Sequence, residues 1–152
     1  DKRCGLALGL RETELPWSSN FLYVDMSSGL SGKEATSLIL KTAKEKHKKA
    51  EAAEWCAEYA FDGTEAGKGF IPSKEELKRL FGNRKKLRQS FALLNSGGLS
   101  GNCLQKDAFY WSSSESYCGD YHAWVVRPSD GNVSYSTKDD SGRVRCVVEF
   151  KI

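Results

Sequence analysis

The chain has 152 residues, of which 39% are hydrophobic, 28% charged and 11% aromatic; this balance excludes a disordered or collagen-like chain and predicts one globular domain over residues 1–152. Its apolar runs, such as Phe91 to Leu94, are far shorter than the roughly 18 residues of a membrane-spanning helix. The formal net charge is +3, and because no apolar leader precedes Asp1, we expect any membrane attachment to depend on an N-terminal anchor that has been removed.

Basic residues are concentrated in two segments before Phe91, Lys41–Lys49 and Arg84–Arg88. Both fall in helical patterns and could attract phosphates. No aromatic residue is interleaved for stacking on bases, so solvated helix faces are favoured and we expect no nucleic-acid partner.

The first elements follow from local patterns. Loose alternation over Leu6–Leu10 predicts a short strand. Ser31 and Glu34 have the spacing of a capping box, which predicts a helix beginning near Gly32. A second helix, or a continuation of the first to about Phe61, is predicted by small residues at helical spacing: Ala53, Cys56, Ala57 and Ala60.

Glycines from Gly63 to Gly69 interrupt the helical pattern. Ser73 and Glu76 form another capping box, and the helix that follows ends at Gly82. Helical periodicity then continues to Asn95. Short β-branched and aromatic runs predict four strands: Phe109 to Trp111, Ala123 to Val126, Val133 to Thr137 and Val144 to Phe150.

Two features of the strand region complete the fold prediction. Asp130-Gly131 predicts a hairpin with a turn of the primed kind. The last strand has Val144, Cys146, Val148 and Phe150 on one face, and Arg145, Glu149 and Lys151 on or near the other. A helix-rich first half and a strand meander predict the α+β class, with helices packed on a small antiparallel sheet.

The sequence offers little chemistry. The five cysteines contain no C-x-x-C pair and the two histidines are far apart, so no zinc site is expected. His122 could act as a base oriented by Asp120, with Cys118 the nearest nucleophile, but neighbours in sequence do not make a catalytic geometry. No phosphate-binding, dinucleotide-binding or H-E-x-x-H motif occurs. We expect no enzyme activity and no cofactor.

The segment from Ser112 to Gly142 is rich in Tyr, Ser, Gly and Asp. This composition is typical of contact surfaces, where tyrosine supplies large amphipathic area and small polar residues adapt their hydrogen bonds. Solvated loops also favour Ser, Gly and Asp, so composition alone leaves both interpretations open.

Several motifs occur in an order that resembles one fold family: Leu6-Ala7-Leu8, Leu15-Pro16-Trp17, Ala53–Tyr59, Gly69–Leu77, Tyr110–Glu115, Ala123-Trp124, Gly131–Val133, Lys138 and Val144–Val147. Together they resemble the bacterial C-type-lectin-like domains of surface adhesins and of variable proteins of diversity-generating retroelements, of the subtype shared with formylglycine-generating enzymes. The resemblance covers nearly the whole chain.

The resemblance implies that error-prone copying changes certain codons near the 3′ end of the gene, within a variable binding region at residues 112–145. The implied scaffold positions are Trp111, Ser112, Glu115, Ala123, Trp124, Gly131, Lys138, Val144 and Arg145. The implied variable, ligand-binding positions are Ser116, Tyr117, Cys118, Gly119, Asp120, Tyr121, His122, Arg127, Ser129, Asp130, Ser134, Tyr135, Ser136, Asp139, Asp140 and Ser141. An NNC codon can encode each of these variable residues.

In this interpretation the domain displays a face that binds a protein or cell-surface receptor, at the cell surface or on a phage particle, and an oligomer is compatible with it. Tyr117, Tyr121 and Tyr135 would be the anchors, and Asp120, His122, Arg127, Asp130, Asp139 and Asp140 would supply polar contacts. The alternatives are a fixed pilus-associated or structural adhesin, and an enzyme of the formylglycine-generating kind. Cys118 and Cys146 lack the surroundings of that enzyme's reactive cysteine pair.

Two further implications concern metals and cysteines. The motifs of calcium-dependent lectins are missing; Asp130 with Asn132, or Asp139 with Asp140, could hold calcium, but hydrated turn carboxylates are commoner, so we expect no required metal. In C-type-lectin-like domains a bridge often joins the first helices to the last strand. For an exported protein the resemblance therefore predicts a disulfide between Cys56 and Cys146, whereas both stay reduced in a cytosolic one.

Overall fold

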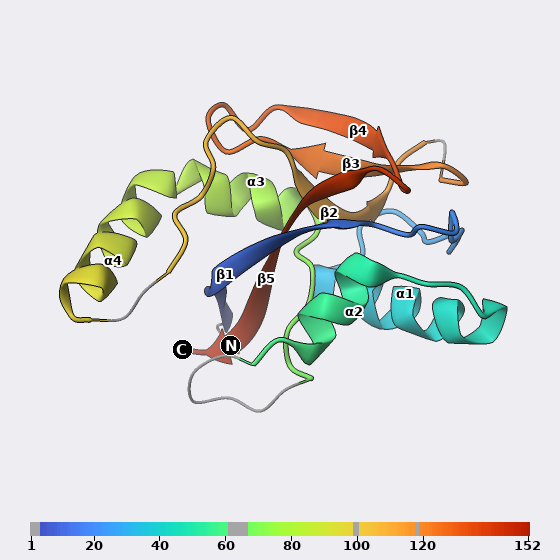
Figure 1. Ribbon diagram of the computed structural model, residues 1–152, viewed down its shortest axis with the longest axis horizontal. Coiled ribbons are helices and arrows are strands. Elements are labelled where there is room, and N and C mark those ends of the chain that lie inside the picture. Colours follow the sequence, from blue (N-terminus) through green and yellow to red (C-terminus); the bar gives the residue numbers. More distant parts are fainter. Residues whose placement is uncertain (1–3, 61–66, 99–100, 118) are drawn as a thin grey trace.

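A computed structural model describes residues 4–60, 67–98, 101–117 and 119–152 (Figure 1). Within them the strands are β1 (Cys4–Pro16), β2 (Tyr110–Glu115), β3 (His122–Val126), β4 (Val133–Thr137) and β5 (Ser141–Lys151). The helices are α1 (Gly32–Lys46), α2 (Glu51–Glu58), α3 (Lys74–Gly82) and α4 (Arg84–Ser96). The α+β class is confirmed. Phe61, Gly63 and Cys118, which carry predictions, lie outside the described residues.

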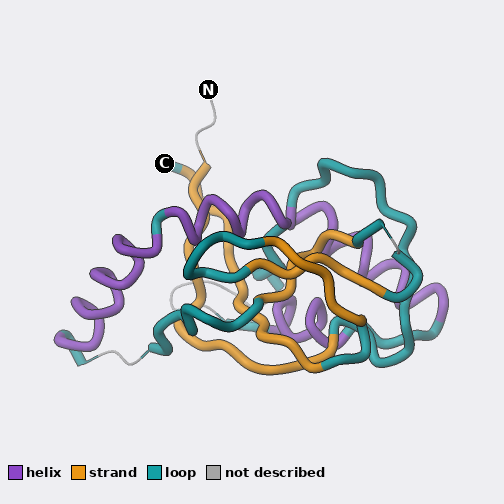
Figure 2. Tube along the Cα trace, turned by 90° about the horizontal axis from the view of Figure 1, so that it is seen from above, coloured by secondary structure: helices purple, strands orange, loops and turns teal. Residues whose placement is uncertain are grey.

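One five-stranded sheet, in the order β1-β5-β2-β3-β4, connects all the strands. β1 and β5 lie side by side as a long antiparallel pair (Figure 2), and β2, β3 and β4 form an antiparallel meander. β2 and β5 are parallel, so the expectation of a wholly antiparallel sheet is wrong. β1 extends beyond the predicted Leu6–Leu10 because β5 pairs with it from Cys4 to Pro16.

The helices cover opposite faces of the sheet. On one face α1 and α2 enclose the larger core, to which Trp111 and Val125 belong. On the other face α3 packs Phe81 against Tyr110 and Val126. Val125 and Val126 enter different cores because successive side chains of a strand point to opposite faces.

Side chains cap the helices where the sequence predicts. The Ser73 hydroxyl accepts from the Glu76 N–H at 3.2 Å, and the Glu76 carboxylate accepts from the Ser73 N–H at 2.9 Å, so this capping box is confirmed. At α1 the Ser31 hydroxyl accepts from the Glu34 N–H. Since His47 follows α1 in the left-handed region (φ 53°), α2 is a second helix and not a continuation of α1.

The middle of β5 is buried on both faces, so Arg145 lies inside the protein although it points away from Val144 and Cys146. Arg145 is 1% exposed and donates to the Gly9 carbonyl at 2.7 Å and to the Glu12 carboxylate at 3.0 Å. Tyr110 donates to the same carboxylate at 2.9 Å, and burial raises the pKa of this tyrosine. A buried cation therefore joins β1 to β5. Phe150, expected on the apolar face, is 46% exposed.

The β3–β4 hairpin is confirmed, but its turn is not the short primed turn expected at Asp130-Gly131. Six residues, 127–132, connect the two strands, and the Arg127 N–H donates to the Asn132 carbonyl at 3.0 Å across the loop. Gly131 has a φ of 68°, a conformation that glycine adopts at little cost.

We predict that Gly142→Ala destabilises the fold. A Cβ at this position would overlap the indole nitrogen of Trp111, which donates to the Leu15 carbonyl at 2.9 Å. Overpacking of this kind costs about 1–3 kcal/mol, so thermal unfolding should shift to a lower temperature. Gly82→Ala is the matched control, because a Cβ there meets no atom within 4 Å; equal melting temperatures for the two variants would contradict the prediction.

Candidate ligand-binding surface

Most of the positions expected as scaffold lie inside the protein. Those exposed by 1% or less are Trp111, Ser112, Ala123, Lys138, Val144 and Arg145. The Glu115 side chain is 4% exposed, whereas Trp124 and Gly131 are only partly buried. Charged residues thus form part of the interior directly beneath the expected binding residues.

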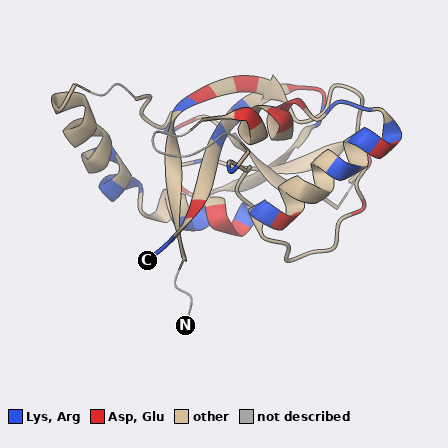
Figure 3. Ribbon diagram, turned by 90° about the horizontal axis from the view of Figure 1, so that it is seen from below, with Lys and Arg blue, Asp and Glu red and all other residues tan. Residues whose placement is uncertain are grey.

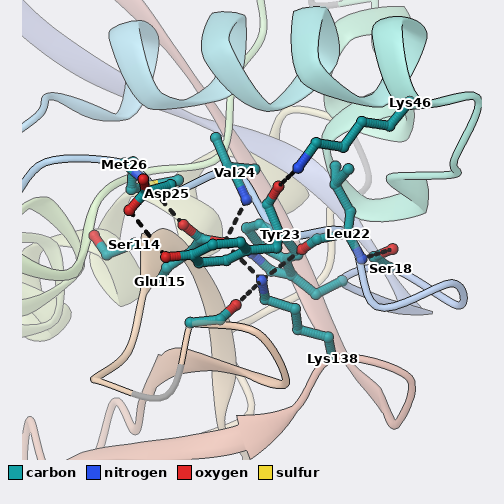
Figure 4. A network of polar contacts seen from close by, with 12 residues as sticks. Ser18, Leu22, Tyr23, Val24, Asp25, Met26, Lys46, Ser114, Glu115 and Lys138 are labelled. Atoms are coloured by element: carbon teal, nitrogen blue, oxygen red, sulfur yellow. Dashed lines mark hydrogen bonds and ion pairs between the residues drawn. The ribbon is translucent and has the colours of Figure 1, made fainter.

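The Lys138 ammonium is the centre of this polar interior (Figure 4). It donates to the Leu22 carbonyl at 2.6 Å, to the Glu115 carboxylate at 2.7 Å and to the Gly119 carbonyl. The ammonium also lies 4.3 Å from the centre of the Trp17 ring. Burial lowers the pKa of Lys138, and the Glu115 carboxylate opposes that shift.

Glu115 fixes a second segment of chain to the same centre. Its two carboxylate oxygens accept from the Val24 N–H at 2.9 Å and from the Met26 N–H at 3.1 Å, as Figure 4 shows. In this loop Phe21 and Asp25 adopt positive φ angles of 53° and 58°, which non-glycine residues rarely do unless surrounding contacts hold them there. Lys138 and Glu115 therefore join the loop after β1 to the ends of β2 and β4.

An aromatic group lies above this framework, and we call Tyr117, His122, Trp124 and Tyr135 the Trp124 cluster. The Trp124 ring contacts Tyr117 edge-on with centroids 5.1 Å apart and Tyr135 at 6.2 Å. His122 contacts Tyr135 at 5.1 Å. Tyr117 is 95% exposed and Tyr135 60%, so two predicted anchors form one apolar surface with Trp124, which the resemblance had assigned to the scaffold.

The sheet and α3 explain why this surface is open. Trp124 pairs directly with Tyr135 across β3 and β4, so both side chains point to the same face of the sheet as Val126. α3 covers Val126 through Phe81. Its first residue, Lys74, holds its ammonium 4.9 Å from the centre of the Trp124 ring, and the helix leaves the remainder of the face uncovered.

Tyr121, the third predicted anchor, belongs to a different group. Its ring contacts Phe21 edge-on at 5.7 Å, and its carbonyl accepts from the Lys138 N–H at 2.8 Å. It is 57% exposed. The structure thus separates Tyr121 from the Trp124 cluster, and it adds the loop that contains Phe21 to the exposed aromatic surface.

The polar residues among the expected ligand-binding positions also lie in different places. Ser134 and Ser136 point to the face opposite Tyr135, because side chains alternate along β4. Three candidates, Asp139, Asp140 and Ser141, are exposed at the turn between β4 and β5. Three others, Ser116, Gly119 and Ser129, are partly buried, and Asp120 is exposed.

Arg127 and Asp130 bind each other. Two hydrogen bonds of 3.1 Å and 2.6 Å connect the guanidinium to the carboxylate, which also accepts from the Asn132 N–H. The Arg127 guanidinium, with this N–H, lowers the pKa of Asp130 to about 2. Asp130 therefore holds the β3–β4 loop in shape, besides being a candidate contact.

The sequence offers His122 as a base oriented by Asp120. Its Nδ1 atom is buried and lacks a hydrogen-bond partner in the described part of the chain, so Asp120 does not orient the ring through that nitrogen. In the same part of the chain, no three His, Cys, Asp or Glu residues gather closely enough to hold a metal ion.

Three surface residues could not be found from the sequence. Phe21, Tyr23 and Lys74 reach the candidate surface from segments far from residues 112–145 in the chain. Tyr23 is 37% exposed and donates to Asp25 at 2.9 Å, which raises the pKa of the tyrosine. Nothing in the sequence marks them as surface residues of this site, since each is a single aromatic or basic residue outside the segment rich in Tyr, Ser, Gly and Asp.

Cys56 on α2 and Cys146 on β5 are neighbours in the larger core. Cys146 donates to the Cys56 sulfur with the two Sγ atoms 2.6 Å apart, both thiols are unbridged, and burial raises the pKa of Cys56. The fold therefore brings together the two residues that the resemblance pairs. Their disulfide stays a prediction for an exported protein.

Comparison with known proteins identifies no relative. The sequence matches no model of a known protein family, and no curated protein matches it. Among the described residues, no helix has the length and apolar character needed to cross a membrane.

Proposed function

We propose that the protein is a display domain that binds a protein or cell-surface receptor through the Trp124 cluster and the neighbouring loops. The observation that carries this proposal is the exposure of Tyr117 and Tyr135 beside Trp124. Soluble proteins rarely leave several large aromatic side chains together in water without an interaction to make. Tyrosine and tryptophan are also the side chains that most often dominate binding energy.

The buried framework supports this function. Lys138 and Glu115 hydrogen-bond to two segments of backbone beneath the surface, residues 22–26 and Gly119, so the exposed residues can differ in sequence with little effect on the core. Such a division suits the proposed C-type-lectin-like fold and diversification by a retroelement. A domain of this kind would be displayed at the cell surface, or on a phage particle.

A fixed adhesin with the same surface is the second candidate. The ion pair of Arg127 and Asp130 favours it, since both proposed variable positions contribute to loop structure and independent changes would break the pair. The two candidates share the binding face and differ in whether its sequence varies.

We predict that Tyr117→Ala with Tyr135→Ala removes binding without unfolding the protein. Each exposed anchor of this kind contributes enough that losing both should weaken affinity about 100-fold or more. The tightest-binding protein from an array of purified cell-surface proteins serves as the probe, and its Kd is measured for the full chain and for the variants.

Leu93→Ala is the matched control, because Leu93 is a 73% exposed apolar residue on α4. It should leave the Kd unchanged, and all variants should melt within a few degrees of the parent. A double tyrosine variant that binds as tightly as the parent would show that the Trp124 cluster is not the binding surface.

Sequencing the 3′ end of the gene in a population grown from one cell tests diversification. We expect substitutions confined to the codons of the variable positions within 116–141 and matched to adenines in a nearby template copy. An invariant segment with no template nearby would instead identify a fixed adhesin.

A further inference from the structure

A groove of about 670 Å³ runs beside the Trp124 cluster. One wall is the loop at residues 26–31 with the first turns of α1 and α3. The other wall is the end of β2 with Tyr117 and Trp124. A volume of this size is in the range that accommodates a small ligand or a short peptide segment.

The groove already holds a cation that belongs to the chain. The Lys74 ammonium lies over the Trp124 ring at 4.9 Å and 3.8 Å from a carboxylate oxygen of Glu75. A ring face combined with a carboxylate attracts cations, because the negative face of the ring and the negative charge act together. Lys74 therefore marks a position at which the groove favours positive charge.

Carboxylates outnumber cations in the lining of the groove. Its lining contains two cations, Lys74 and Arg79, and four carboxylates, Glu34, Glu75, Glu76 and Glu115. Glu115 is neutralised by Lys138, and Glu76 accepts from the Gly32 and Ser73 N–H groups. Glu34 and Glu75 are exposed. Glu75 pairs only loosely with Lys74 and Lys78, at 3.8 Å each, and Glu34 accepts from the Ser31 hydroxyl, so both carboxylates can be reached by a cation from outside.

We propose that this groove takes an arginine side chain from an extended segment of the protein partner, with the guanidinium stacked on Trp124 in place of Lys74 and paired with Glu34 or Glu75. Arginine fits better than lysine because its planar guanidinium stacks on aromatic rings and forms forked hydrogen bonds to carboxylates. The groove is larger than one guanidinium, so flanking residues of the same segment occupy the rest. This inference rests on the proposed function, since it names the chemistry of the receptor.

The test uses the full chain and two pentapeptides, acetyl-Gly-Gly-Arg-Gly-Gly-amide and the same peptide with citrulline, which has the shape of arginine without its charge. Titration is followed by the NMR signal of the Trp124 indole N–H, assigned among the four tryptophans with Trp124→Phe. The arginine peptide should shift this signal and the citrulline peptide should not.

Two variants change the site in opposite directions. Lys74→Met removes the internal competitor and should tighten the arginine peptide about threefold, while Glu34→Gln with Glu75→Gln should weaken it by a similar factor. Lys85→Met and Asp107→Asn are matched controls for the change of charge, since both residues are exposed and neither lines the groove; they should leave the affinity unchanged.

Equal shifts with arginine and citrulline, or an unchanged affinity in Lys74→Met, would overturn this inference. Neither result would contradict the proposed function if the variant with Tyr117→Ala and Tyr135→Ala still binds the receptor more weakly than the parent. Conversely, unchanged receptor affinity in that variant would refute the proposed function, whatever the result of the peptide titrations.

Discussion

The proposed binding face depends on one buried ammonium group. Lys138 is fully buried, and its ammonium is stabilised there by Glu115, two backbone carbonyls and the ring of Trp17. Removing one partner of such a pair leaves an uncompensated buried charge, which costs about 3–5 kcal/mol. Since Glu115 also accepts from two N–H groups of the loop after β1, the loop, the end of β2 and the turn after β4 are positioned together.

A second buried ion pair, between Arg145 and Glu12, joins β1 to β5. Apolar residues would stabilise these positions equally well or better. Charged groups differ in requiring particular partners in particular directions, which suits a fold that must hold irregular loops in one arrangement. The basic residues of α1, by contrast, are exposed along the helix (Figure 3), and Lys46 at its end donates to the Tyr23 carbonyl at 2.6 Å.

The features of the fold that could be predicted from the sequence are those set by residues close together in the chain. The capping box of Ser73 and the strand at Val133–Thr137 depend on nearby residues, and both were predicted correctly. The burial of Arg145 depends on Glu12, 133 positions away, and no local pattern reveals such a partner. In the same way, composition indicated the exposed tyrosines, whereas Lys74 reaches Trp124 only because α3 begins there.

Hydrogen exchange of the Val24 and Met26 amides in Lys138→Met tests whether the buried ammonium positions the loop after β1. Both N–H groups donate to Glu115, so if Lys138 holds that carboxylate in place, the two amides should exchange much faster in the variant. The amide of Val147 on β5, which donates to the Phe70 carbonyl at 3.0 Å, should keep its protection. Unchanged exchange at Val24 and Met26 in a folded Lys138→Met protein would show that the loop is held by other contacts, and would contradict this account.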